Sequence, residues 1–247
     1  MKFFTGTHLP HWLEFSEFPL FVSVRTLRRH RCFRDSVCSW ALDSGGFSEL
    51  SMYGKWETSV KRYCREYDKF SQFGGLEWAA IQDWMCEEII LKKTGLSVLE
   101  HQTRTVNNYA DLLNARPNAR WCPVLQGYTL DEYKHCLDLY QQRFNLFALP
   151  IVGLGTMCRR QGTKEAEAIV KYFTGIGLKI HAFGFKTKGL ATTNALLTSS
   201  DSLAWSFSAR KNPALPGHSH KNCANCYQFA QRWRSQLLNK LGEVRID

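Results

Sequence analysis

Residues 40–47 read Trp-Ala-Leu-Asp-Ser-Gly-Gly-Phe. The apolar residues lead directly into Asp43, which is followed by Ser44, two glycines and Phe47. This pattern predicts a buried strand that ends in a carboxylate, and then a turn whose backbone another group can approach closely. Folds that alternate strands and helices place their chemistry at such strand ends. On this stretch alone an Asp that merely caps the turn is favoured, because Asp-Ser-Gly-Gly is ordinary turn chemistry.

Short apolar runs like this one recur along the chain and alternate with segments of helical periodicity. Ser97 with Glu100 and Thr129 with Glu132 match the capping box that opens a helix, and Thr163 is expected to open another. Further helices are expected over 55–70 and 227–241. The predicted strands are Phe3–Thr7, Leu20–Val24, Cys38–Asp43, Trp78–Gln82, Arg120–Leu125, Phe147–Val152, Lys179–Phe183 and Ser199–Trp205.

About eight strand–helix units in a chain of 247 residues predict an α/β fold, a (β/α)8 TIM barrel with a C-terminal zinc-binding loop and helix. An open, doubly wound sheet is the alternative. Since no linker-like segment interrupts the sequence, we expect a single TIM-barrel domain over 1–247, with the zinc-binding loop at about 211–230.

The composition points to a basic protein with a polyanionic partner. Lys and Arg number 32 against 22 Asp and Glu, which gives a net charge of +10. Nucleic acid is the simplest such partner, although a basic surface that only confers solubility would give the same charge. No signal peptide or bilayer-length apolar segment is visible, so we expect a cytoplasmic protein with mostly reduced cysteines.

Polar groups and glycines fall at the predicted strand ends. Asp43 and Asp201, on opposite strands of the predicted barrel, suit chemistry at a glycosidic carbon, where one carboxylate attacks and the other transfers protons. Asp83 could hydrogen-bond the N–H edge of a base, and Gln126 could read its carbonyl. Each residue also has an ordinary structural explanation, such as a helix cap or a loop. The other candidate substrate-binding residues are Ser44, Gly45, Gly46, Phe47, Gly127, Gly153, Leu154, Gly155, Gly184, Phe185 and Trp205.

A second cluster combines ligands for a metal. His218, His220, Cys223 and Cys226 lie within nine residues and include a Cys-x-x-Cys, a donor set that suits a tetrahedral, structural Zn²⁺. A redox or unligated Cys-x-x-Cys is the alternative. Basic side chains follow several strand ends and could hold phosphates around the barrel mouth; the candidates are Arg159, Arg160, Lys186, Lys188, Arg210 and Lys211.

Taken together, these motifs resemble the tRNA-guanine transglycosylase superfamily. The resemblance rests on Asp-Ser-Gly-Gly-Phe at 43–47, Val-Leu-Gln-Gly at 124–127, Val-Gly-Leu-Gly at 152–155 and the C-terminal zinc cluster, over about residues 38–230. The short chain, the 200–205 segment and the altered zinc ligands resemble most the DpdA branch, the phage and bacterial relatives that insert 7-deazaguanine derivatives into DNA. If the chain is phage-encoded, we expect it in the host cytoplasm.

The resemblance implies a zinc-containing TIM barrel that exchanges guanine for a 7-deazaguanine base, such as 7-cyano-7-deazaguanine, through a covalent Asp–nucleotide intermediate. Asp43 then corresponds to the general acid/base, and Asp83, Gln126 and Gly127 to base recognition. Asp201 is assigned as the nucleophile because it is the only acid in its segment, where the tRNA enzymes carry two.

Other departures leave alternatives open. Two family zinc ligands are replaced by His218 and His220, and Ser48 stands where the tRNA enzymes have Gln. The substrate could instead be tRNA, or the chain could be a non-catalytic nucleic-acid-binding relative. The sequence does not define the oligomeric state.

Overall fold

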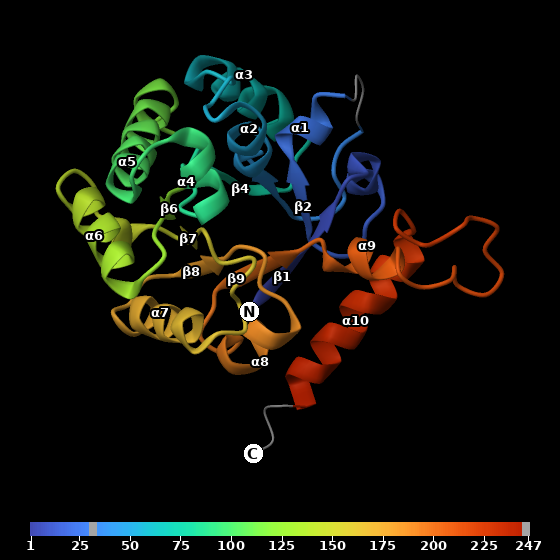
Figure 1. Ribbon diagram of the computed structural model, residues 1–247. Helices are drawn as coiled ribbons and strands as arrows, with labels where there is room; N and C mark the ends of the chain where they lie inside the picture. The colour runs from blue at the N-terminus through green and yellow to red at the C-terminus, as the bar shows by residue number, and fades with distance from the viewer. Residues whose placement is uncertain (30–33, 244–247) are drawn as a thin grey trace.

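The computed structural model describes residues 1–29 and 34–243. In this part of the chain nine strands form one parallel sheet in the order β5-β4-β3-β2-β1-β9-β8-β7-β6 (Figure 1). The strands are β1 (Lys2–Thr7), β2 (Leu20–Ser23), β3 (Trp40–Asp43), β4 (Leu76–Ala80), β5 (Trp121–Cys122), β6 (Val124–Leu125), β7 (Val152–Leu154), β8 (Ile180–Ala182) and β9 (Ser199–Ser202).

The two ends of this sheet belong to one stretch of chain. β5 pairs with β4, and β6 pairs with β7. Only Pro123 separates β5 from β6, and because proline has no N–H to donate, it interrupts the ladder there. If β5 and β6 are counted as one strand, the sheet is an eight-stranded barrel that is nearly closed. The predicted (β/α)8 barrel is confirmed, and the open doubly wound sheet is excluded.

Helices surround the barrel and follow its strands (Figure 1). They are η1 (Pro10–Glu14), α1 (Val24–Leu27), α2 (Gly46–Tyr53), α3 (Val60–Ser71), α4 (Glu88–Thr94), α5 (Val98–Ala115), α6 (Leu130–Gln141), η2 (Leu146–Ala148), α7 (Lys164–Gly175), α8 (Thr187–Thr193), α9 (Ala204–Ala209) and α10 (Tyr227–Glu243). Both predicted capping boxes form, at the starts of α5 and α6, and Thr163 caps α7. Among the described residues, none of the helices has both the length and the apolar character that crossing a membrane requires.

Alternation along the strands divides the apolar residues into two layers. Outward residues such as Leu42 and Ile180 pack in the main core, against the helices. Inward residues fill the barrel itself, where Phe4, Trp78 and Cys122 belong to a second cluster. The inward positions nearest the carboxyl ends of the strands are therefore free to carry polar groups.

Two predicted strands differ from the observed ones. The predicted strand Phe147–Val152 is wrong for most of its length, because residues 146–148 form η2 and β7 starts only at Val152. Pro150 lies between them and cannot donate to a ladder. The predicted strand Ser199–Trp205 ends early, at Ser202, and α9 begins at Ala204.

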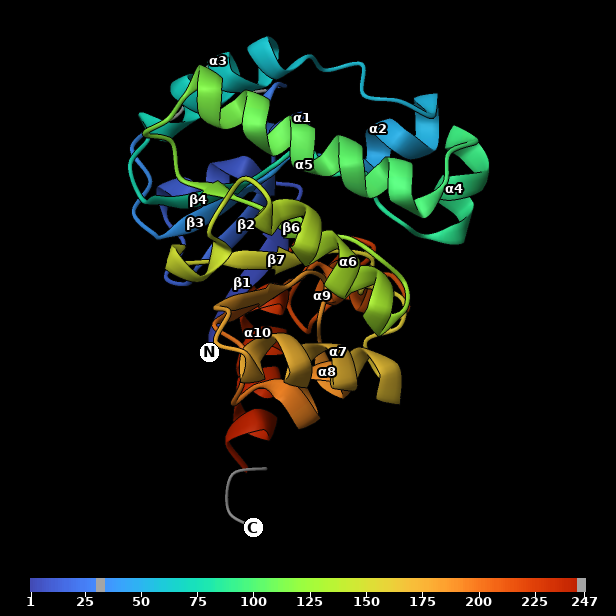
Figure 2. The ribbon, with the colours of Figure 1, turned by 90° about the vertical axis from the view of Figure 1, so that its left-hand side faces the viewer.

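Helices α2 and α4 lie beyond the carboxyl end of the barrel, to one side of its mouth (Figure 2). Leu50, Trp84 and Ile90 form a small apolar cluster there, separate from the two barrel layers. Trp56 and Met85 pack against it. This cluster holds the segment that follows β3 over the strand ends, where the functional site lies.

Candidate active site and metal centre

Three carboxylates, those of Asp43, Asp83 and Asp201, line one cavity of about 580 Å³ at the carboxyl ends of the strands. Asp43 ends β3 and Asp201 lies in β9. The sheet order places only β2 and β1 between them, so they are not on opposite strands as predicted. Their side chains still converge, because all parallel strands end at the same rim of the barrel.

Asp43 is held by its neighbours on both sides. The backbone N–H of Gly45 and the hydroxyl of Ser23, its partner in β2, both hydrogen-bond to its carboxylate. Burial raises the pKa of the Asp43 carboxyl, these two hydrogen bonds oppose the rise, and the negative charge of Asp201 adds to it. A carboxyl with a raised pKa can hold and return a proton near neutral pH, which suits general acid–base catalysis.

Asp201 is fixed through one of its two oxygens. Oδ1 accepts a hydrogen bond of 2.9 Å from the backbone N–H of Gly184 and lies 3.3 Å from Nε2 of His181. Gly184 has a φ of +69°, and an added Cβ would lie 2.4 Å from Sγ of Cys158, so only glycine fits here. No described residue donates a hydrogen bond to Oδ2 of Asp201. That oxygen is therefore available to react.

His181, which was not among the predicted site residues, is fully buried inside the barrel. Its Nδ1 lies 2.9 Å from the Ser199 hydroxyl. The ring packs edge-on against Trp78 and Phe183, with centroid distances of 4.6 and 4.5 Å. Both nitrogens are engaged and the ring is enclosed, so His181 holds Asp201 in one orientation. The sequence feature that could have identified His181 is a polar side chain at an inward-facing position of a predicted strand.

Asp83 is oriented by a chain of buried hydrogen bonds. Its Oδ2 accepts from the side-chain amide of Gln126. Oε1 of Gln126 accepts from the Thr156 hydroxyl at 2.6 Å, and that hydroxyl accepts from the backbone N–H of Cys86 at 2.9 Å. Gln126 is fully buried and lies behind Asp83, not at the cavity wall where reading a base carbonyl requires it. Thr156 has a φ of +54°, a strained conformation that is concentrated at functional sites.

The ionisation of Asp83 makes the stability of the fold depend on pH. Burial raises the pKa of Asp83 from 3.8 to about 7, and the charge of Asp43 contributes to the rise. The native state therefore keeps this proton at pH values where the unfolded chain has lost it. The free energy of unfolding therefore falls as the pH rises from about 4 to about 7. Above about pH 7 the native state bears the full energetic cost of an ionised, buried Asp83.

Asp83→Asn is expected to remove this cost, because an amide does not ionise. The free energy of unfolding of the variant minus that of the wild type should increase by on the order of 2 kcal/mol from pH 5 to pH 8. Urea unfolding of both proteins at the two pH values measures this difference. An equal difference between the two proteins at both pH values would contradict a raised pKa at Asp83.

The remaining predicted substrate-binding residues divide into two groups. Those that line the cavity are Gly45, Phe47, Gly155 and Gly184. Those that the structure places outside its lining are Ser44, Gly46, Gly127, Gly153, Leu154, Phe185 and Trp205. Gly155 leaves room for Gln126, since an added Cβ would lie 2.1 Å from its Nε2.

Two of the three aromatic residues predicted to bind the substrate, Phe185 and Trp205, are buried in the main core. Trp205 stacks on Trp12 with a centroid distance of 5.4 Å, and its indole N–H donates to the Gly6 carbonyl at 2.7 Å. These contacts assign Trp205 to packing. The aromatic side chains that do line the cavity are Phe21, Phe47 and Phe183.

The predicted phosphate-binding residues lie in segments that follow strands. Arg159 lines the cavity itself, and the other five are Arg160, Lys186, Lys188, Arg210 and Lys211. None of the six forms a salt bridge with a described residue. Their charges are therefore available to an anionic partner.

Other cavity-lining residues were missed. Arg25, Glu87 and Cys158 face the cavity together with His8. Oε2 of Glu87 is buried and has no hydrogen-bond partner among the described residues. Burial raises the pKa of Glu87, and the charge of Arg159 opposes the rise. His8, Glu87 and Cys158 lie in loops and Arg25 lies in α1, which is only four residues long, so sequence periodicity carries no information at these positions.

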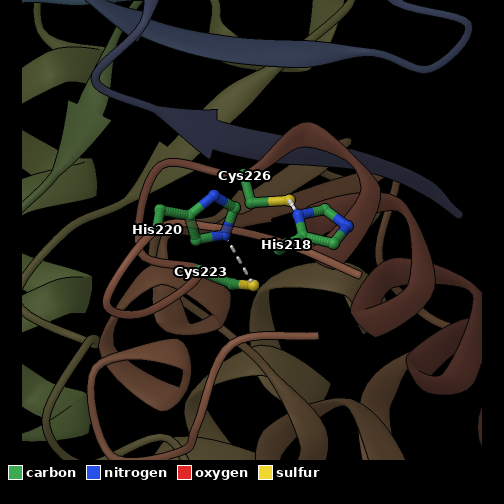
Figure 3. Close-up of side chains that lie close together, drawn as sticks. All are labelled: His218, His220, Cys223 and Cys226. Carbon is green, nitrogen blue, oxygen red and sulfur yellow. Dashed lines mark hydrogen bonds between the residues drawn. The ribbon is translucent and has the colours of Figure 1, made fainter. Parts of the chain in front are cut away.

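The predicted metal ligands converge in the loop between α9 and α10, as Figure 3 shows. The ligand atoms of His218, His220, Cys223 and Cys226 all lie within 4.8 Å of one another. Nε2 of His220 is 3.1 Å from Sγ of Cys223, and Nδ1 of His218 is 3.7 Å from Sγ of Cys226. In a tetrahedral zinc site the ligand atoms are about 3.3–3.8 Å apart. This cluster could therefore hold a metal ion after a small contraction.

Neighbouring groups support the same arrangement. Nε2 of His218 lies 2.9 Å from the side-chain oxygen of Gln228, which leaves Nδ1 for a metal. The backbone N–H of Leu215 donates to Sγ of Cys223 at 3.2 Å and orients this sulfur. Two imidazoles and two thiols match the donor set of structural zinc sites.

Comparison with known proteins gives one family. The chain matches, over residues 1–246, the model of the family described as "DpdA: DeoxyPurine in DNA protein A". A search of curated proteins gives no match.

Proposed function

Since this chain belongs to the DpdA family, we propose that it is a DNA-guanine transglycosylase, which exchanges guanine in DNA for a 7-deazaguanine derivative such as 7-cyano-7-deazaguanine. The observation that carries the proposal is the pair Asp43 and Asp201, two carboxylates in one cavity with Asp83 beside them. Two carboxylates with different environments are what a double displacement at a glycosidic carbon needs.

In the first half of the reaction, Oδ2 of Asp201 attacks C1′ of the target nucleotide. A C1′–O bond forms and the C1′–N9 bond breaks, and its electron pair leaves with guanine. Asp43, whose pKa is raised by burial, gives guanine the proton that it needs to depart as a neutral base. His181 and the N–H of Gly184 keep Asp201 aimed at C1′.

In the second half, the ionised Asp43 takes the N9 proton of the incoming 7-deazaguanine. N9 then attacks C1′, the C1′–O bond breaks, and its electron pair returns to Asp201. The DNA backbone stays intact because every bond change occurs at C1′ and its base. Asp83 accepts hydrogen bonds from the N–H edge of each base, and Gln126 and Thr156 hold it in position.

The metal in this proposal is zinc, bound by His218, His220, Cys223 and Cys226. The cluster is formed within the loop before α10, and none of its members lines the cavity. Its role is therefore structural: it fixes this loop and the start of α10 against the barrel.

The function is tested with purified protein, an oligodeoxynucleotide and candidate 7-deazaguanine bases. Mass spectrometry of the digested nucleosides should show a new deoxynucleoside and an equal loss of deoxyguanosine. A parallel reaction with tRNA serves as the control. Exchange into tRNA alone would reject the choice of DNA, and exchange into neither would support a non-catalytic relative.

A further inference from the structure

Three exposed aromatic side chains, in segments that follow the carboxyl ends of β3, β6 and β9, each lie under a cation. The guanidinium of Arg160 is 4.1 Å from the ring centre of Tyr128, and Nζ of Lys211 is 4.4 Å from that of Phe207. The third pair joins Arg159 and Phe47 at 5.5 Å. The rings are 52% exposed at Tyr128, 60% at Phe207 and 40% at Phe47. We call these pairs the aromatic rim.

The fold places all three pairs on the side of the barrel where the strands end, the side on which the cavity lies. Phe47 and Arg159 line the cavity directly, and Tyr128 follows β6 just beyond Gln126. Arg160 connects Tyr128 to the cavity residue Arg159, its neighbour in the chain. Its guanidinium stacks on the Tyr128 ring and donates to the Tyr128 carbonyl oxygen.

Phe207 lies in α9, the helix that follows β9, the strand that carries Asp201. Burial and then the positive charge of the adjacent Arg210 lower the pKa of His8, a cavity residue. The segment that carries the exposed ring of Phe207 therefore also brings positive charge near the cavity.

The rim cations form no salt bridge with a described residue. This distinguishes them from a similar cation–ring pair on the outside of the barrel. Arg159, Arg160 and Lys211 form no salt bridge with a described residue. On the outer helices Lys134 also lies over an exposed ring, that of Tyr172, but its ammonium is bound by Asp131 at 3.1 Å. Within residues 1–29 and 34–243, the rim pairs are thus the ones that combine an exposed ring with a cation that forms no salt bridge.

An exposed ring beside an unpaired cation can stack on a base and neutralise the adjacent phosphate. In a duplex the faces of the bases are covered by their neighbours, so such rings would meet only the backbone. A base that enters the cavity must leave its stack, and its neighbours then also need a surface. The net charge of +10 is complementary to any nucleic acid, but the exposed rings are complementary only to unpaired bases.

From this geometry we infer that the enzyme takes its DNA in single-stranded form, with the nucleotides flanking the target guanine stacked on Tyr128, Phe207 and Phe47. The inference rests on the proposed function for its choice of DNA. It adds the strandedness of the substrate and the residues that recognise it.

The test measures fluorescence anisotropy with labelled single strands of about 15 nucleotides and with the duplex of the same sequence. The single strand should bind at least about ten-fold more tightly. Tyr128→Ala and Phe207→Ala should each weaken single-strand binding about 5- to 100-fold, as expected for the loss of one stacked base. Tyr128→Leu should not restore it, because leucine keeps apolar area without a flat ring.

Two matched variants on other faces serve as controls. Phe147, in η2, is as exposed as Phe47, at 40%, and Tyr172 belongs to the neutralised outer pair. Phe147→Ala and Tyr172→Ala should change the affinity less than about two-fold. Equal affinity for the duplex and the single strand, or equal losses in the rim and control variants, would overturn the inference.

Base exchange on the same oligonucleotides separates this inference from the proposed function. Exchange that occurs on the duplex and not on the single strand would leave the function in place and reject the single-stranded substrate. Tight single-strand binding that depends on Tyr128 and Phe207, but without exchange of any base, would reject the function and keep the binding surface.

Discussion

Replacing Asp201 with Asn is expected to reduce base exchange by about 10⁴-fold while the fold remains intact. The loss is large because an amide oxygen is a poor nucleophile toward C1′, and in the proposed mechanism Asp201 is the residue that forms the covalent intermediate. The structure should tolerate the change, since the Asn side-chain oxygen can still accept from the Gly184 N–H. Thermal unfolding of the variant checks that the fold survives.

The same reaction also tests which of the two carboxylates attacks. Asp43→Asn should slow exchange by about 10²- to 10⁴-fold, because the departing guanine loses its general acid. Replacing the target guanine with 7-methylguanine removes this requirement, since that cationic base leaves without receiving a proton. In the absence of an incoming base, the covalent protein–DNA adduct can then be followed on denaturing gels.

With 7-methylguanine DNA, Asp43→Asn should form the adduct at close to the wild-type rate, and Asp201→Asn should form none. The opposite pattern would assign the attack to Asp43. Loss of the adduct in both variants would reject the division into a nucleophile and a proton donor. The Asp201→Asn reaction also controls for spontaneous loss of 7-methylguanine.

The parts of the fold that local chemistry determines were predictable. The capping boxes at Ser97 and Thr129 are decided within four residues, and both form. The three carboxylates were predictable as a group because every parallel strand delivers its carboxyl end to one rim. Identifying the strand ends was therefore enough to expect Asp43, Asp83 and Asp201 together, although the order of strands around the barrel was not predictable in this way.

The parts that long-range contacts determine were not predictable. Trp205 faces Trp12, a residue far away in the sequence, because α9 begins directly after Leu203 and turns the indole toward the core. An aromatic residue beside an acid is equally consistent with stacking on a substrate. The position of Gln126 depends likewise on Thr156, 30 residues away.

The loop that carries the candidate metal ligands makes few buried contacts with the rest of the protein. Its dependence on zinc can therefore be tested. Most residues from 211 to 221 are exposed, and the buried anchors are Cys223 and Ala224. The Ser206 hydroxyl donates to the Ala224 carbonyl at 2.7 Å, which ties the loop to α9. Beyond the loop, α10 buries Ala230, Leu237 and Leu241 against the main core, so this helix has support that the loop lacks.

Cys223→Ser is expected to lose about one equivalent of bound zinc per chain and to make the 211–226 segment a site of rapid proteolytic cleavage. Metal analysis and limited proteolysis measure the two effects. Because the barrel core is separate from the cluster, the unfolding temperature should fall by several degrees rather than collapse. Cys38→Ser, which changes a half-buried thiol far from the loop in sequence, should retain the metal and the protection. Unchanged zinc content in Cys223→Ser would show that the four side chains converge without binding this metal.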